Sequence, residues 1–172
     1  ANIDDNVGAM RRFLKKEGLA DNTIFIFTTD NGTSAGARVH NNGMRGQKGS
    51  EYDGGHRVPF FIHWPKGGLT GGRDVETITS YVDIVPTLIN YCQVPSPKGV
   101  KFDGVNIRPL VEGKAKNWTD RILVTDSQRV RDPIKWRKSA VMTDQWRLVN
   151  GKELYDINAD PGQKQNIAAA NP

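Results

Sequence analysis

A short apolar run at residues 23–28 constrains the fold of this 172-residue chain more than any other feature of its sequence. The run consists of β-branched and aromatic residues, is apolar on both faces, and stops abruptly before Asp30-Asn31-Gly32. This pattern is typical of a strand in a parallel sheet that helices cover on both sides. A second apolar run, at residues 58–64, predicts another strand. We therefore expect an α/β fold.

Two amphipathic helices are predicted around these strands. Helical spacing predicts the first over about residues 4–17, with apolar positions at Ile3, Val7, Met10 and Leu14. Asp83 is a suitable N-cap for the second helix, and Pro86 then falls in the first turn, where its missing N–H costs little. Cys92 is expected to be a small core residue, because it continues an apolar face formed by Val85, Leu88 and Ile89.

After residue 113 the pattern changes to short runs that are typical of strands. Asp144-Gln145 is a candidate tight turn between two of them. The runs lie at residues 122–124, 139–142, 146–149 and 154–157. We therefore predict two domains. Residues 1–113 form the C-terminal part of a larger α/β domain, with a mixed or parallel sheet and flanking helices, and residues 114–172 form a small antiparallel α+β subdomain.

Composition excludes several classes of partner. The 24 basic and 19 acidic residues are interleaved along the chain, and the net charge of +5 indicates a mildly basic surface. There is no Lys/Arg block and no nucleic-acid-binding motif, so no nucleic-acid partner is expected. No apolar run approaches the roughly 20 residues that cross a bilayer, so no membrane partner is expected. The single cysteine, Cys92, excludes an intrachain disulfide within this segment.

Two polar segments lie where chemistry is expected. In open α/β sheets ligands bind beyond the carboxyl ends of strands. Asp30 and Asn31 would place a carboxylate and an amide oxygen there, which are ligands that calcium or magnesium prefers. An ordinary turn is the alternative interpretation. Arg45 and Lys48 lie among glycines at residues 43–59, where backbone and cations can close on a small anion.

The two segments, in this order and at this spacing, resemble the sulfatase family of the alkaline-phosphatase-like superfamily. The resemblance covers nearly the whole chain. Asp53 departs from the family pattern, which usually has Glu at that position. The matching motifs are Leu19-Ala20-Asp21-Asn22-Thr23-Ile24, Thr29-Asp30-Asn31-Gly32, Arg45-Gly46-x-Lys48-Gly49, Gly54-Gly55-x-Arg57-Val58-Pro59, Asp83-Ile84-Val85-Pro86-Thr87-Leu88, Phe102-Asp103-Gly104-Val105 and Glu153-Leu154-Tyr155-Asp156-Ile157.

The resemblance implies a role for several residues. Asp30 and Asn31 would be two ligands of an active-site calcium ion, with magnesium as the alternative. Lys48 would be catalytic: it would contact the sulfate oxygens and help the leaving group depart. Arg45 and Arg57 are interpreted as structural, pairing with carboxylates or loop carbonyls. The substrate would be a sulfated small molecule or a sulfated sugar. From its place in the loop, His40 is a further candidate substrate contact, with a solvated loop histidine as the alternative.

The resemblance also implies that part of the active site is missing. Sulfatases use a formylglycine made from Cys or Ser in a Cys/Ser-x-Pro/Ala-Ser-Arg motif, and Cys92 is followed by Gln93-Val94-Pro95. The chain is therefore expected to be a fragment of a sulfatase that is inactive alone. A phosphonate or phosphodiester hydrolase, or a non-catalytic sulfatase-like binding module, is the alternative. By resemblance alone the parent enzyme would be periplasmic or secreted, and no oligomeric state is predicted.

Overall fold

The computed structural model describes residues 2–171 of the chain. Short 3₁₀ turns connect the main elements at residues 20–22, 35–38, 65–67, 81–83 and 168–170. The helices and strands, in chain order, are α1 (Asn2–Lys16), β1 (Phe25–Thr28), α2 (Asp53–His56), β2 (Phe60–His63), α3 (Ile84–Cys92), α4 (Arg108–Val111), β3 (Leu123–Asp126), β4 (Ser139–Met142), β5 (Trp146–Val149) and β6 (Glu153–Asp156).

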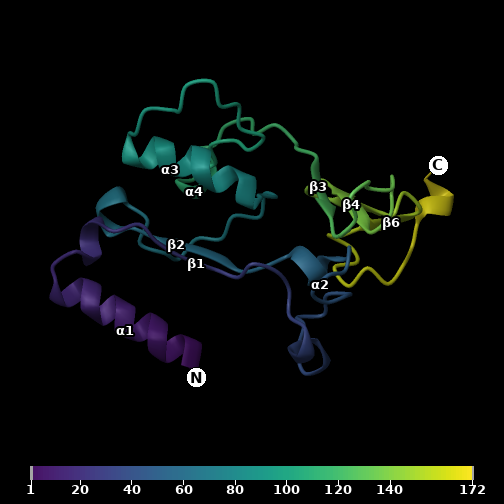
Figure 1. Ribbon diagram of the computed structural model, residues 1–172, viewed down its shortest axis with the longest axis horizontal. Coiled ribbons are helices and arrows are strands. Elements are labelled where there is room, and N and C mark those ends of the chain that lie inside the picture. Colours follow the sequence, from purple (N-terminus) through teal and green to yellow (C-terminus); the bar gives the residue numbers. More distant parts are fainter. Residues whose placement is uncertain (1, 172) are drawn as a thin grey trace.

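The first part of the chain is layered around β1 and β2. Figure 1 shows α1 on one side of this two-stranded ribbon and α3 on the other, which is the helix–strand–helix layering of an α/β fold. The predicted α/β class is thus confirmed. The two strands pair antiparallel, with Phe25 opposite His63 and Thr28 opposite Phe60. For the strand at residues 23–28, a place in a parallel sheet covered on both sides was expected instead. All four residues of β1 are only half-buried, because β2 is its sole partner strand among residues 2–171.

Helix α3 begins as predicted but buries a different face. Asp83 occupies its N-cap position without a side-chain capping hydrogen bond, and the buried residues are Thr87 and Tyr91. The ring of Tyr91 packs edge-on against Trp64, with ring centroids 5.5 Å apart. Cys92, the last helical residue, is exposed, so its prediction as a core residue is wrong. The helix is oriented by the aromatic contact of Tyr91, which spacing within the helix does not reveal.

The carboxylate of Asp83 also joins three separate segments. It is fully buried and accepts hydrogen bonds from the backbone N–H groups of Ser80, at 2.8 Å, and Val105, at 2.9 Å. Arg121 donates two further hydrogen bonds to it, at 2.7 and 2.9 Å. A buried carboxylate is tolerated when paired in this bidentate way. Asp83 therefore fastens α3 to the segment that leads into the C-terminal sheet.

The C-terminal strands form the predicted antiparallel sheet, in the order β3-β4-β5-β6. Figure 1 shows this sheet at one end of the molecule, with α2 beside it and α1 at the other end. Its core contains Ala140, Met142, Val149 and Tyr155. Tyr52, which precedes α2, packs against the same core. The sheet therefore supports the region around α2. Within residues 2–171 no helix is long and apolar enough to cross a membrane.

Candidate active site

The loop that follows β1 presents Asp30 and Asn31 at the end of the strand. Gly32 then donates its backbone N–H to the carbonyl of Gly55, at 3.0 Å, and so ties this loop to α2. A Cβ atom at Gly32 would lie 1.8 Å from the carbonyl oxygen of Gly54. Only glycine permits this approach of the two backbones. Gly32 therefore allows a close backbone contact directly after Asp30-Asn31.

A second loop holds Lys48 beside the first. The backbone N–H of Lys48 donates to the carbonyl of Thr33, at 2.8 Å. Within this second loop the side-chain amide of Asn41 donates to the carbonyls of Met44 and Gly46, at 2.8 Å each. These bonds link Lys48 to the end of β1 through the backbone, while its side chain remains exposed.

The structure brings all four predicted site residues into one open pocket of about 520 Å³, whose lining includes Asp30, Asn31, His40 and Lys48. Arg57 lines the same pocket. Within residues 2–171 the side chains of the four predicted residues make no hydrogen bond or ion pair, so they are available to a ligand. The pocket combines a carboxylate, an amide oxygen and an ammonium group, a set that suits a cation and an anion bound side by side.

The oxygen donors fit part of a metal site. Calcium takes about six to eight oxygen ligands, and magnesium takes six in an octahedron. Asp30 and Asn31 supply two oxygens of the required hard type. Among the described residues no group of three or more His, Cys, Asp or Glu side chains is placed to hold a metal ion. Residues 2–171 therefore contain donors for a hard cation but not a complete coordination shell.

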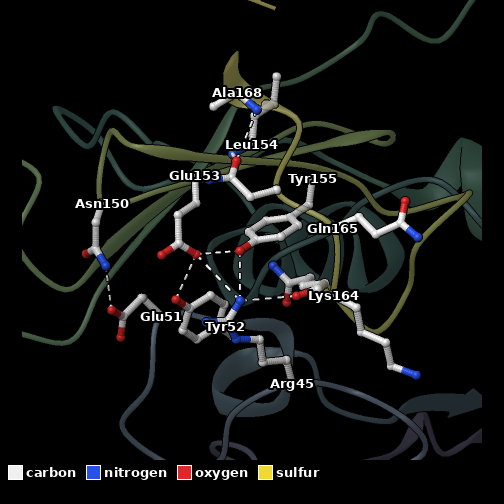
Figure 2. Close-up of polar contacts among 12 residues, drawn as sticks. Arg45, Glu51, Tyr52, Asn150, Glu153, Leu154, Tyr155, Lys164, Gln165 and Ala168 are labelled. Atoms are coloured by element: carbon white, nitrogen blue, oxygen red, sulfur yellow. Dashed lines mark hydrogen bonds and ion pairs between the residues drawn. The ribbon is translucent and has the colours of Figure 1, made fainter. Parts of the chain in front are cut away.

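Arg45 lies in the same loop as Lys48 but contacts the C-terminal sheet (Figure 2). It donates hydrogen bonds to the hydroxyl of Tyr155, at 2.7 Å, and to the carbonyl of Gln163, at 3.1 Å. The guanidinium lies 3.6 Å from the carboxylate of Glu153 and 3.9 Å from the ring centre of Tyr52. Arg45 is thus structural, as predicted: it joins the loop that carries Lys48 to β6.

The carboxylate of Glu153 is the centre of this cluster. It accepts hydrogen bonds from the hydroxyls of Tyr155, at 2.5 Å, and Tyr52, at 2.9 Å. Burial alone would raise the pKa of Glu153, but the two hydrogen bonds and the charge of Arg45 outweigh burial and lower the pKa. Burial and the bond to Glu153 raise the pKa of Tyr52 to about 12. Burial and the bond to Glu153 also raise the pKa of Tyr155, so Glu153 stays ionised and both tyrosines stay protonated near neutral pH.

Asp53, the departure from the family pattern, is buried and is not among the residues that line the pocket. Its buried carboxylate accepts a hydrogen bond from Arg147 in β5, at 3.0 Å. Arg57 and His56 lie 3.6 Å from its two oxygens. The backbone N–H of Asp53 donates to the side-chain oxygen of Gln163, at 2.9 Å. Asp53 therefore holds α2 against the C-terminal segment.

Sequence reasoning missed Arg147, which is 7% exposed and lies at the centre of this arrangement. One signal was present: Arg147 and Val149 lie two residues apart, which places both on the buried face of β5. A charge on the core-facing side of a strand implies a buried partner. His56 beside it is also largely buried, and burial lowers its pKa despite the opposing attraction of Asp53.

The layers (Figure 1) and the pocket define the class of the protein: an α/β domain with charged side chains gathered in an open pocket at the end of a strand. Comparisons with known proteins narrow this class. The chain is 31% identical over 170 residues to an arylsulfatase of Clostridium perfringens, with 96% of the chain and 33% of that protein covered. A crystal structure of Ps i-CgsB in complex with k-i-k-neocarrahexaose superimposes with a TM-score of 0.84 at 28% identity, covering 98% of the chain and 37% of that protein.

A further neighbour is the crystal structure of the phosphonate monoester hydrolase of Agrobacterium radiobacter. It has a TM-score of 0.71 and 28% identity, and covers 98% of the chain and 35% of that protein. The profile of the Sulfatase family matches residues 1–94, and the chain belongs to the sulfatase family. It spans about a third of the length of the relatives named here, at 33% and 37% of the arylsulfatase and of Ps i-CgsB.

Proposed function

We propose that this chain supplies the metal- and sulfate-facing part of the active site of an enzyme that hydrolyses sulfate esters. The substrate is a sulfated small molecule or a sulfated sugar. The main support is the pocket beyond β1, where the side chains of Asp30, Asn31, His40 and Lys48 meet without partners among residues 2–171. Membership of the sulfatase family gives this pocket its chemical interpretation.

Lys48 contacts the sulfate group in this proposal. A cation beside the ester neutralises the negative charge that accumulates on the sulfuryl oxygens, and on the leaving oxygen as the S–O bond breaks. The backbone bond from Lys48 to Thr33 supports this role, since it anchors the loop while leaving the ammonium group exposed. His40, in the same pocket, is a second substrate contact.

Asp30 and Asn31 are two ligands of a calcium ion in this proposal, with magnesium as the alternative. When bound, the ion adds positive charge beside the sulfuryl group. The remaining ligands and a formylglycine nucleophile come from residues outside this chain. The chain's length, 33% of that of the Clostridium arylsulfatase, supports this division of the active site.

The test is hydrolysis of 4-nitrophenyl sulfate by the complete protein that contains this chain. Replacing Lys48 with Ala is expected to lower kcat/KM about 10²- to 10³-fold, the usual cost of removing one group that stabilises transition-state charge. Lys66→Ala, an exposed lysine beyond the pocket, is the matched control. Calcium affinity of Asp30→Ala, measured by calorimetry, tests the metal role without relying on activity. Equal rates for the Lys48 and Lys66 variants would contradict the proposal.

Hydrolysis of phosphonate monoesters is a second candidate, supported by the neighbour from Agrobacterium. The complete protein is assayed in parallel with 4-nitrophenyl sulfate and 4-nitrophenyl phenylphosphonate. A higher kcat/KM for the sulfate supports a sulfatase, and the reverse ratio supports the alternative. Turnover of neither ester, with calcium still bound, identifies a non-catalytic binding module.

A further inference from the structure

A second pocket borders the residue that follows Lys48. Lys48 lines the pocket that contains Asp30, and the next residue, Gly49, lines this second pocket of about 400 Å³. The opposite wall is the loop between β3 and β4, at residues 127–138. Two consecutive residues of the chain therefore border the two pockets.

The second pocket is strongly basic. Arg129, Arg137 and Lys138 line it, and all three are exposed. Within residues 2–171 their side chains make no ion pair or hydrogen bond. The loop at 127–138 holds five basic residues and one acidic residue. That leaves 19 basic and 18 acidic residues elsewhere, so this loop carries most of the net charge of +5. The net positive charge, which seemed evenly spread along the sequence, is therefore concentrated in this one loop.

The loop's own side chains hold it in shape without using these cations. Gln128 donates from its backbone and side-chain nitrogens to the two oxygens of Asp126, at 2.8 and 2.7 Å. Its side-chain amide also exchanges hydrogen bonds with the backbone of Ile134, at 3.1 and 2.9 Å. The carboxylate of Asp126, just before the loop, is thus paired with Gln128. The loop is therefore held in shape by Gln128, and the three cations have no ion-pair partner within residues 2–171.

Asn150 fixes the two walls of the second pocket relative to each other. Its side-chain nitrogen donates to the carboxylate of Glu51, at 2.7 Å, two residues beyond Gly49 (Figure 2). Its backbone N–H donates to the carbonyl of Ser139, at 2.9 Å, directly after Lys138. The pocket is therefore held open by a defined contact rather than by a chance approach of two loops.

We propose that this second pocket binds another anionic group of the same substrate molecule. The substrate is then a sulfated oligosaccharide with negative groups on neighbouring sugars: one sulfate lies at Lys48 and a second sulfate or carboxylate lies at Arg129, Arg137 and Lys138. Single-stranded nucleic acid fits less well, because the lining contains no aromatic side chain on which a base could stack. This inference rests on the proposed function, since it assigns the first sulfate to Lys48.

The experiment measures binding by calorimetry, with the complete protein at fixed low salt. The probes are a polysulfated tetrasaccharide, a monosulfated monosaccharide and a single-stranded oligonucleotide of the tetrasaccharide's charge. The double variant Arg129→Ala/Arg137→Ala is used, because Lys138 has a left-handed backbone, with φ +48°, that disfavours alanine. Arg131→Ala, an exposed arginine of the same loop outside the pocket lining, is the matched control.

The double variant is expected to weaken binding of the tetrasaccharide about tenfold or more, since two charge-assisted contacts are lost. Binding of the monosulfated sugar and hydrolysis of 4-nitrophenyl sulfate should change less than about twofold, as should every measurement on Arg131→Ala. An equal effect on both sugars, or no effect on the tetrasaccharide, overturns the inference. So does wild-type binding of the oligonucleotide as tight as that of the tetrasaccharide.

The two proposals fail separately in this design. If 4-nitrophenyl sulfate is hydrolysed but the double variant binds the tetrasaccharide normally, the second anion site is wrong and the sulfatase function stands. If no sulfate ester is hydrolysed but the double variant loses only the tetrasaccharide, the anion site stands and the catalytic proposal is wrong. Thermal unfolding of each variant verifies that the comparisons are made on folded protein.

Discussion

The guanidinium of Arg147 donates a 3.0 Å hydrogen bond to the carboxylate of Asp53, and both side chains are buried, with 8% and 1% exposed. This pair joins β5 of the C-terminal sheet to α2. Through the bond between Gly55 and Gly32, α2 in turn supports the loop that carries Asp30. The pocket at the end of β1 therefore depends structurally on the C-terminal sheet.

Replacing Arg147 with Met should destabilise the protein by about 3–5 kcal/mol, because it leaves the Asp53 carboxylate buried without its closest cation. Urea unfolding gives the free energy. Adding Asp53→Asn should restore part of the loss, since the uncompensated charge is removed. Arg131→Met, at an exposed site with no partner among residues 2–171, should change stability by less than about 0.5 kcal/mol. Similar urea concentrations at the unfolding midpoint for the Arg147 and Arg131 variants would show that the Arg147–Asp53 pair does not stabilise the fold.

Gly32→Ala tests the contact between the two backbones. The added Cβ would meet the carbonyl oxygen of Gly54 at 1.8 Å, so the loop after β1 must shift. We expect a loss of about 1–3 kcal/mol, measured by thermal or urea unfolding, and weaker calcium binding in the complete protein. Gly8→Ala in α1 is the control, and it should raise the free energy of unfolding. Alanine is more favourable than glycine within a helix by about 0.5–1 kcal/mol. Unchanged stability in Gly32→Ala would mean that the loop adapts freely.

The cluster around Glu153 predicts a pH dependence of stability. The folded-state pKa of Glu153 is lower than the ordinary value of 4.5, so its ionised form is favoured in the folded protein. This contribution is fully present above about pH 4.5 and is lost as the pH falls through the lowered pKa. Glu153→Gln should therefore lose less stability than the wild type between pH 7 and pH 3. Glu17→Gln, whose side chain has no partner within residues 2–171, should follow the wild type.

The isolated 172-residue chain is expected to show no arylsulfatase activity and only weak calcium binding. In the proposed site Asp30 and Asn31 would provide only two of the about six to eight oxygens that calcium requires. Calcium titration by calorimetry, compared with the complete protein, measures the difference. Detectable hydrolysis of 4-nitrophenyl sulfate by the isolated chain, abolished by Lys48→Ala, would contradict the prediction.

Local patterns in the sequence were sufficient for much of the fold. The strand at residues 23–28, the helix that begins after Asp83 and the four C-terminal strands were predictable, because period and start signals depend on neighbouring residues. The order of the motifs from Asp30 to Lys48 was sufficient to indicate the family. The burial of Cys92 was predicted wrongly, because the packing of Tyr91 on Trp64 orients the helix.

Only the tertiary structure decided which distant residues meet. Arg45 contacts Glu153, Arg147 contacts Asp53, and the basic loop at residues 127–138 faces Gly49. Each of these contacts joins the first part of the chain to the C-terminal sheet. Their partners are chosen by how that sheet packs against α2, and such packing has no period or spacing in the sequence. The sequence by itself therefore determined the elements and the chemical groups, whereas packing between remote segments determined the pockets.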